Sequence, residues 1–123
     1  MTANNNFPTA ITLHKKSKQL ELMYADIQYL LSAEYLRVYS PSAEVRGHGV
    51  GQEVLQLNKE NIGIVQLEPS GNYALKIVFD DGHDSGLFTW DYLYKLATQQ
   101  EAHWQDYLNR LELSGHKRKS DGG

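Results

Sequence analysis

The clearest pattern in the chain is an alternation of apolar and polar residues over 73–79. In an extended chain, successive side chains point to opposite faces of the strand. Asp81-Gly82 follows this run, and both residues tolerate the positive φ angles of a hairpin turn. The pattern predicts a central strand over 73–79 that returns as a partner strand at Ser85–Phe88. Tyr73, Leu75, Ile77 and Phe79 fall on one face of this strand, and we expect Leu75, Ile77 and Phe79 to be largely buried.

Other stretches predict further strands. Ile62–Glu68 is extended, and the turn residues 70–72 lead it into the central strand, so three strands form a meander. Nearer the N-terminus, residues 11–13 and 20–24 alternate on either side of a polar turn at Lys15–Lys18. These two runs predict a hairpin with one buried face. Residues 53–58 fit a short helix or a short strand equally well.

Helical spacing appears at Leu31, Tyr35 and Val38, which lie at positions i, i+4 and i+7. Ser32 is placed to cap this short helix, because a serine hydroxyl accepts from an N–H group of the first turn. Ser40-Pro41 ends it, since proline cannot supply the next helical N–H group.

The C-terminal part of the domain is predicted to be helical. Thr89 is placed to cap a helix that begins at Trp90. Thr98 and Glu101 have the spacing of a capping box, so we expect a break near Thr98 and two helices instead of one. The predicted fold is therefore α+β: a small antiparallel sheet, made of the N-terminal hairpin and the meander, packed with a short helix and the C-terminal helices.

A chain of 123 residues fits one domain. We expect this domain to span residues 10–115. The polar residues 1–9 and the basic tail at 116–123 carry no pattern of buried positions and are expected to be disordered.

Charge and cysteine content narrow the class of protein. The net charge is −3, and because the tail contributes +2, the body carries −5. An acidic body argues against a nucleic-acid surface, which needs clustered Lys and Arg. The chain has no cysteine, so disulfides and thiolate sites are excluded. No apolar run approaches the roughly 20 residues that span a bilayer, and no signal peptide is seen, so we expect a cytoplasmic protein without a membrane partner.

Two stretches, taken together, point to a family. LRVYSPSAEVRGH covers residues 36–48, and FDDGHDSGLFTWDYL covers residues 79–93. They resemble the family of unknown function called DUF971, also described as the γ-butyrobetaine hydroxylase-like N-terminal domain. The resemblance covers about residues 10–97. It implies an α/β domain with an antiparallel sheet, and related domains occur fused to iron–sulfur cluster carrier proteins.

The resemblance also bears on zinc. In the hydroxylases this domain holds a structural zinc ion through three cysteines and one histidine. By motif, the cysteine positions fall at Ser40, Ser42 and Val45, and the histidine position falls at His83. Serine and valine do not replace thiolates at a structural zinc site. We therefore expect no metal there, and we expect hydrogen bonds to hold His83 against the turn at 40–45.

His83 has a second interpretation. With His48, Asp81 and Asp84 it offers imidazole and carboxylate groups that bind a divalent metal ion weakly. The alternative is a turn histidine that bonds nearby groups and fixes the hairpin to the Ser40–Val45 turn. His48 itself lies among Gly47, Gly49 and Gly51, in a stretch that lacks the lysine and spacing of a phosphate loop.

The remaining candidates concern contacts with other proteins. Arg37 is expected to pair with Asp80 or Asp84 and so to tie the short helix to the hairpin. Trp90 and Trp104 are expected in the core, whereas Tyr92 and Tyr94 lie off the apolar stripe of their helix and suit an interface. The partner-binding candidates are Arg37, Ser40, Ser42, His48, His83, Tyr92 and Tyr94.

No set of residues in the sequence matches a catalytic constellation. There is no nucleophile-elbow motif and no facial triad of two histidines and a carboxylate. The sequence therefore favours a small non-catalytic accessory or interaction domain, with an unidentified protein as partner and no cofactor, and the resemblance implies a link to metal-centre biology. Its functional face is expected at Ser40–Gly51 and Asp81–Ser85. The alternative is a weak metal-binding protein.

Overall fold

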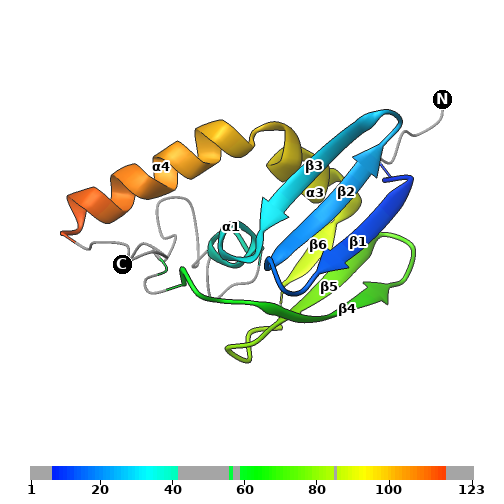
Figure 1. Cartoon of the computed structure of the whole chain (residues 1–123), viewed down its shortest axis with the longest axis horizontal. Coiled ribbons are helices and arrows are strands. Elements are labelled where there is room, and N and C mark those ends of the chain that lie inside the picture. The colour runs from blue at the N-terminus through cyan, green and yellow to red at the C-terminus, as the bar shows by residue number, and fades with distance from the viewer. Residues whose placement is uncertain (1–6, 42–55, 57–58, 85, 116–123) are drawn as a thin grey trace.

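The computed structural model of the chain describes residues 7–41, 56, 59–84 and 86–115. Within these residues, six strands form two three-stranded antiparallel sheets, and three helices complete an α+β fold (Figure 1). This confirms the predicted fold class. The first sheet has the order β1-β2-β3, with β1 at Ala10–His14, β2 at Gln19–Tyr24 and β3 at Ile27–Ser32. The second has the order β4-β5-β6, with β4 at Ile64–Ser70, β5 at Ala74–Phe79 and β6 at Leu87–Thr89.

The first sheet contains the predicted hairpin and one strand that was not predicted. Residues 10–14 pair with 19–23 around the Lys15–Lys18 turn, as expected. β3 then pairs with β2 after a two-residue turn, in which Ala25 has a φ angle of 51°. The helical spacing had placed Leu31 in a helix, but Leu31 lies in β3 opposite Leu20.

The second sheet confirms that the strand containing Ile77 is central, because β5 pairs with β4 on one side and with β6 on the other. Leu75, Ile77 and Phe79 are buried as predicted. Tyr73 is 57% exposed, because it precedes the strand and lies in the turn after β4. β6 begins at Leu87, later than the predicted return strand.

Two of the three helices begin at the predicted caps. In α1, Ala33–Val38, the Ser32 hydroxyl accepts a hydrogen bond from the Tyr35 N–H group. In α3, Trp90–Thr98, the Thr89 hydroxyl accepts one from the Tyr92 N–H group. The third helix, α4, spans Gln100–Leu113.

The helical segment is interrupted between α3 and α4 as predicted, but the capping-box explanation is wrong. Thr98 is the last residue of α3, and its hydroxyl donates back to the Tyr94 carbonyl at 2.9 Å. The N-cap position of α4 belongs to Gln99, which makes no side-chain capping bond.

The main core joins both sheets with α1 and α3, whereas Tyr107 and Leu111 of α4 pack with Val38 in a second, smaller cluster. In Figure 1 the β1-β2-β3 sheet lies in front of α3 and the second sheet, and α4 extends to one side. Two tyrosine hydroxyls fasten the helices: Tyr35 donates to the Leu96 carbonyl at 2.7 Å, and Tyr39 donates to the His103 carbonyl at 2.7 Å. The side chains with no exposed surface include Leu20, Leu22, Leu31, Leu36, Ile77, Phe88, Leu93 and Leu96.

The fold also includes residues just before β1. The Thr9 N–H group donates to the Met23 carbonyl at 2.7 Å, and the Phe7 ring stacks on Trp90 with centroids 4.6 Å apart. The folded part therefore begins before Ala10, earlier than the sequence predicted. In the described part of the chain, no helix has both the length and the apolar character needed to cross a membrane.

Candidate functional site

The predicted functional residues that the structure describes meet where the end of α1 approaches the turn after β5. Arg37 lies in the last turn of α1, and Ser40 follows the helix. The turn is closed by two backbone hydrogen bonds, from Phe79 N–H to the His83 carbonyl at 3.0 Å and from Gly82 N–H to the Phe79 carbonyl at 3.1 Å. Gly82 has a φ angle of 90°, which favours glycine.

Asp81 is the centre of this site, because three donors bind its carboxylate. Arg37 Nε lies 3.0 Å from Oδ2, and Lys59 Nζ lies 2.8 Å from the same oxygen. The His83 backbone N–H group donates to Oδ1 at 3.1 Å. The carboxylate thus joins α1, the segment before β4 and the turn after β5. We call the set Arg37, Ser40, Lys59, Asp81 and His83 the polar cluster.

This arrangement corrects the predicted partner of Arg37, which was Asp80 or Asp84. The Asp80 backbone N–H group donates to the Gly63 carbonyl at 2.9 Å, which turns this residue toward the start of β4. The Asp84 carboxylate lies 3.9 Å from Lys76 Nζ on the exposed surface of β5. The tight turn at Gly82 presents Asp81 to the helix instead.

The electrostatics of Asp81 follow from these contacts. Burial alone would raise the pKa of its carboxyl group. The hydrogen bonds from Lys59, the His83 backbone and Arg37, together with the positive charge of Arg37, outweigh burial and lower the pKa to about 2. Asp81 is therefore an anion throughout the neutral pH range, and its charge is balanced by two cations.

His83 and Ser40 form the buried half of the polar cluster. The Ser40 side chain has no exposed surface, and His83 is 6% exposed. Ser40 Oγ and His83 Nε2 are hydrogen-bonded at 2.9 Å. The imidazole ring also packs beside Phe79, with centroids 5.9 Å apart. These contacts tie the hairpin to Ser40, in the way expected of a turn histidine.

The Ser40–His83 pair also shows that the residues present do not fit a structural zinc ion. A zinc ion between a thiolate and an imidazole holds the two donor atoms about 3.5 Å apart, given bond lengths of about 2.3 and 2.0 Å. Here the two donor atoms bond each other directly, and a serine hydroxyl occupies the position that resembles a cysteine. A direct hydrogen bond takes the place of a metal bridge.

The alternative metal site has no further support within the described residues. Among them, no group of three His, Asp or Glu side chains is close enough to hold a metal ion. His48 and Ser42 lie outside the described residues, as do Gly47–Gly51 and Val45. The weak metal site that includes His48 stays a prediction.

Tyr92 and Tyr94 are half-buried in α3. The Tyr92 hydroxyl donates to the Tyr39 carbonyl at 2.6 Å, so this residue fastens the chain that follows α1. The Tyr94 ring meets Tyr24 edge to face, with centroids 5.1 Å apart. Each of them has a structural contact, and their proposed role in partner binding stays a prediction. Trp90 is buried as expected, whereas Trp104 is half-buried and packs against the core.

Sequence reasoning missed Lys59. It precedes Asp81 by 22 residues, in a stretch where no pattern distinguishes a strand from a helix. The position of Lys59 depends on the backbone path before β4, which a single sequence does not supply. The one available signal is charge, since Lys59 is the only cation between Arg46 and Lys76.

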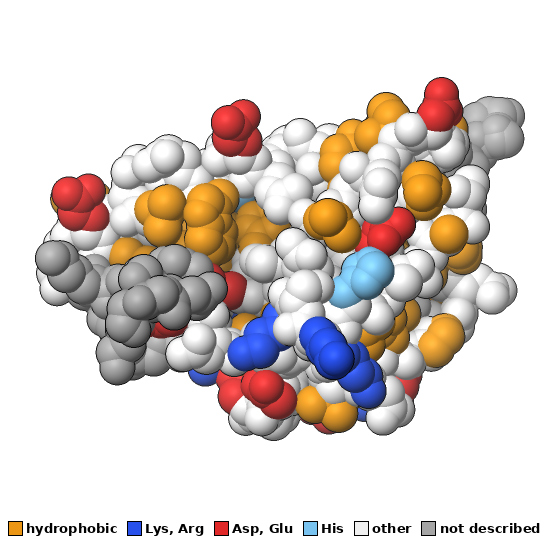
Figure 2. All heavy atoms as spheres, viewed as in Figure 1, with side chains coloured by type: hydrophobic (Ala, Val, Ile, Leu, Met, Phe, Trp, Pro, Cys, Tyr) orange, Lys and Arg blue, Asp and Glu red, His pale blue; other side chains and the backbone are white. Residues whose placement is uncertain are grey.

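Charged side chains are unevenly distributed on the surface. On the face shown in Figure 2, Lys and Arg side chains gather in one region below the centre of the view, whereas Asp and Glu side chains are scattered. Exposed apolar side chains appear over α4 and toward the tip of β2 and β3 (Figures 1 and 2). A partner bound to this face would meet apolar and charged areas together.

Comparison with known proteins places the fold in a family. The model of the family described as "Gamma-butyrobetaine hydroxylase-like, N-terminal" matches residues 11–94. No curated protein matches the chain.

Several solved structures are similar to it, including the following three. One, determined by NMR in solution, is 58% identical, covers 96% of this chain and 94% of its own, and has a TM-score of 0.83. A second NMR structure is 49% identical, covers 96% of this chain and 90% of its own, and has a TM-score of 0.76. The third is a 1.93 Å crystal structure of a DUF971 family protein of unknown function from Acidithiobacillus ferrooxidans ATCC 23270. It is 31% identical, covers 78% of this chain and 98% of its own, and has a TM-score of 0.64.

Proposed function

The chain belongs to the γ-butyrobetaine hydroxylase-like N-terminal family, DUF971, and from this membership and its polar cluster we propose a non-catalytic accessory domain that binds another protein. The proposal rests mainly on the hydrogen bonds that the Asp81 carboxylate accepts. Its carboxylate accepts from Arg37, Lys59 and the His83 backbone, and these three donors come from different parts of the chain. The carboxylate therefore links α1, the segment before β4 and the turn after β5.

The chemistry of Asp81 supports a binding role over a catalytic one. A general base at neutral pH works best with a pKa near 7 and with a lone pair directed at the substrate. The pKa of Asp81 is lowered to about 2, and both carboxylate oxygens already accept hydrogen bonds. A carboxylate with this pKa and these hydrogen bonds stabilises the local structure and does not act as a proton acceptor at neutral pH.

The same argument applies to His83. Its Nε2 atom is occupied by the Ser40 hydroxyl, and the side chain is nearly excluded from solvent. An imidazole that shuttles protons must reach the reacting group directly or through one water molecule. The hydrogen bond between buried His83 and buried Ser40 stabilises the turn. A turn of fixed shape suits a surface that binds a partner.

The exposed residues around this turn are the part that a partner would contact. Asp80 and Asp84 flank the turn in sequence and are exposed, and Asp84 lies 3.9 Å from Lys76, so both carboxylates are within reach of a partner. Because related domains occur fused to iron–sulfur cluster carrier proteins, the partner that we favour is a protein that assembles or carries a metal centre. Such a partner would present a basic surface to the turn.

Quantitative co-purification from the native cell tests this function. The wild-type chain, Asp84→Lys and Glu112→Lys would be compared, with Glu112 as the matched control because it is an exposed acidic residue at the far end of α4. We expect one or more proteins to be captured by the wild type and by Glu112→Lys, and to be depleted with Asp84→Lys. Equal capture by the wild type and both variants, or no capture by the wild type, would contradict the proposal.

A further inference from the structure

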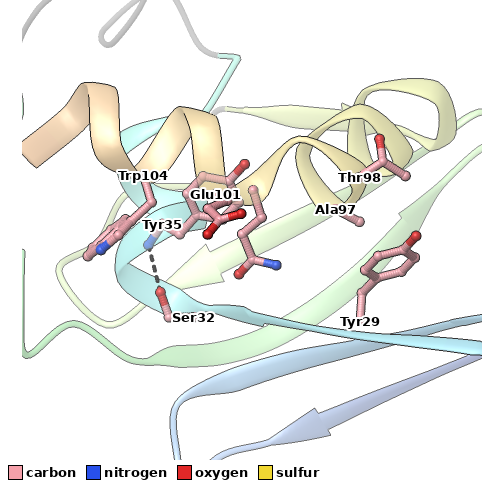
Figure 3. A pocket seen from close by; sticks show the side chains of 8 residues that line it. Tyr29, Ser32, Tyr35, Ala97, Thr98, Glu101 and Trp104 are labelled. Carbon is pink, nitrogen blue, oxygen red and sulfur yellow. Dashed lines mark hydrogen bonds between the residues drawn. The ribbon is translucent and has the colours of Figure 1, made fainter.

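A pocket of about 460 Å³ lies between the end of β3, the first turn of α1 and the corner where α3 meets α4. It is separate from the polar cluster. Figure 3 shows Trp104, Tyr35 and Glu101 together at one end of the pocket, and Tyr29 and Thr98 at the other. Ser32 lies on the strand side, where its hydroxyl caps α1 (Figure 3).

The break between the helices accounts for the position of Glu101. Because α3 ends at Thr98 and α4 begins at Gln100, the chain changes direction over the end of β3. Glu101 then falls in the first turn of α4, where a carboxylate is favoured by the helix dipole. Its side chain is exposed, so it reaches the rim of the pocket without being used in the core.

The aromatic walls of the pocket are held in place by the fold. The Tyr35 hydroxyl is fixed to the Leu96 carbonyl, and its ring meets Trp104 edge to face with centroids 6.3 Å apart. At the opposite end, the Tyr29 ring meets Tyr24 edge to face at 6.0 Å. A ligand would therefore find these rings already arranged, without the cost of ordering them.

The chemistry of the walls suits a cation on an apolar stem. Aromatic faces attract Lys and Arg side chains, and a nearby carboxylate adds a charged hydrogen bond. Among the residues that the structure describes, Glu101 is the only charged side chain that lines the pocket, and no cation forms an ion pair with it. The negative charge of −3 on the chain as a whole acts in the same direction.

The strand beside the pocket suits an extended partner. β3 is an edge strand, and within the described residues no other strand pairs with its outer side. Its register with β2 is uninterrupted over Ile27–Ser32, which leaves a regular row of backbone groups at the edge. Ile27 and Leu30 are 55% and 42% exposed on the same strand. Regular edges of this kind accept an added strand from another protein.

We propose that this pocket and the edge of β3 together bind an extended segment of a partner protein, which pairs with β3 and places an arginine or lysine side chain between Trp104, Tyr29 and Glu101. The proposal rests on the proposed function of an interaction domain and assigns it a second surface. It also names the partner chemistry: a β-forming segment with one basic residue directed into the pocket.

Selection from a random library of displayed linear peptides tests this inference. We expect enriched peptides to share one basic residue within a stretch of β-branched residues. Changing that basic residue to glutamine in a selected peptide should weaken binding about tenfold, because the cation–aromatic contact is lost. Glu101→Gln should do the same, because the charged hydrogen bond is lost. Glu112→Gln, on the same helix but outside the pocket, should leave the affinity unchanged.

Amide NMR spectra of the same variants place the bound peptide and check the fold. The expected shifts lie at Tyr29, Ser32 and Thr98, and Glu101→Gln alone should leave the remaining spectrum intact. The inference is overturned if no peptide is enriched, if the enriched peptides lack a basic residue, or if their affinity does not depend on Glu101. If partner capture still depends on Asp84 in that case, the second surface is lost while the proposed function stands.

Discussion

Asp81 receives three hydrogen-bond donors although its side chain is 27% exposed. Exposed ion pairs contribute little, about 0 to 1 kcal/mol each, because solvent screens them and the side chains lose entropy. Here the donors include Arg37, whose side chain is only 9% exposed, and a backbone N–H group that needs no further ordering. The Asp81 contacts should therefore contribute more than a surface pair.

Asp81→Asn should destabilise the domain by about 1 to 2 kcal/mol at neutral pH. The pKa of Asp81 is lowered from 3.8 to about 2 on folding, so the charged carboxylate stabilises the folded state above pH 3.8. That stabilisation is lost as the pH falls toward 2, because the carboxylate then takes up a proton. Urea unfolding should show a difference in the free energy of unfolding between wild type and variant at about pH 7, and this difference should become smaller at about pH 3.

The control for this measurement is Asp84→Asn, which removes a carboxylate of the same turn that is not part of the polar cluster. It should change stability by less than about 0.5 kcal/mol. If the loss of unfolding free energy caused by Asp81→Asn stays constant with pH, the contacts of Asp81 do not depend on its ionisation.

Phe79→Ala should cost about 3 to 5 kcal/mol, the range for removing a buried aromatic ring from a core. Phe79 is 1% exposed and packs in the main core beside His83. Val78→Ala on the other, half-buried face of β5 is the control and should cost less. Denaturant unfolding measures both. A loss below about 1 kcal/mol for Phe79→Ala would mean that this face contributes little to the core.

At the scale of single residues, the sequence predicted some contacts of the polar cluster and missed others. The Ser40–His83 contact was expected because the two stretches that resemble the family place both residues at positions that bind one zinc ion in the hydroxylases. The pairing of Arg37 with Asp81 was missed because it depends on which of three neighbouring carboxylates the turn presents to α1. The sequence predicts the Asp81-Gly82 turn, but it does not show which side chain of the turn faces α1.

At the scale of elements, hydrophobic periodicity found five of the six described strands but not β3. Ile27, Tyr29 and Leu31 alternate as a strand requires, yet Leu31 also fits the helical spacing to Tyr35. Leu31 pairs with Leu20 in the sheet, and Ser32 then serves both as the last strand residue and as the helix cap. Overlapping periods at a strand-to-helix junction cannot be separated from one sequence.

Two threonines with the same chemistry should respond differently to alanine. Thr89 accepts a hydrogen bond from the Tyr92 N–H group at the start of α3, so Thr89→Ala should cost about 1 kcal/mol. Thr98 ends the same helix, and its hydroxyl bonds a carbonyl of the preceding turn, so Thr98→Ala should change stability by less than about 0.5 kcal/mol. Thermal unfolding of both variants gives the comparison.

The comparison also decides between two explanations of the helix break. If Thr98→Ala were as costly as Thr89→Ala, Thr98 would act as a cap in solution, and the capping box would be restored. The alternative explanation is tertiary, since the Tyr35 and Tyr39 hydroxyls donate to the Leu96 and His103 carbonyls on either side of the break. Such long-range contacts are not visible in local sequence.

At the scale of the whole molecule, the two small sheets share one core with α1 and α3, and α4 adds a second, smaller apolar cluster. Neither sheet is large enough to be stable alone, since isolated small sheets need a packed face. The β1-β2-β3 sheet contributes Leu20, Leu22 and Leu31, and β5 and β6 contribute Ile77 and Phe88. The polar cluster then joins α1 to the second sheet at the edge of this core. The fold thus closes through apolar packing and hydrogen bonds at the position where the resemblance implies a zinc ion.

The whole-molecule prediction is that the thermal midpoint does not depend on metal. Structural zinc contributes roughly 10–16 kcal/mol in small domains that depend on it, so its removal by a strong chelator unfolds them. Here Ser40 bonds His83 directly, and the buried core extends through both sheets. Protein purified without added metal should therefore melt at the same temperature with and without chelator, whereas a zinc-finger peptide in the same buffer should lose its transition. A fall of many degrees that zinc or iron reverses would contradict this, and it would favour a metal site that uses His83 and His48.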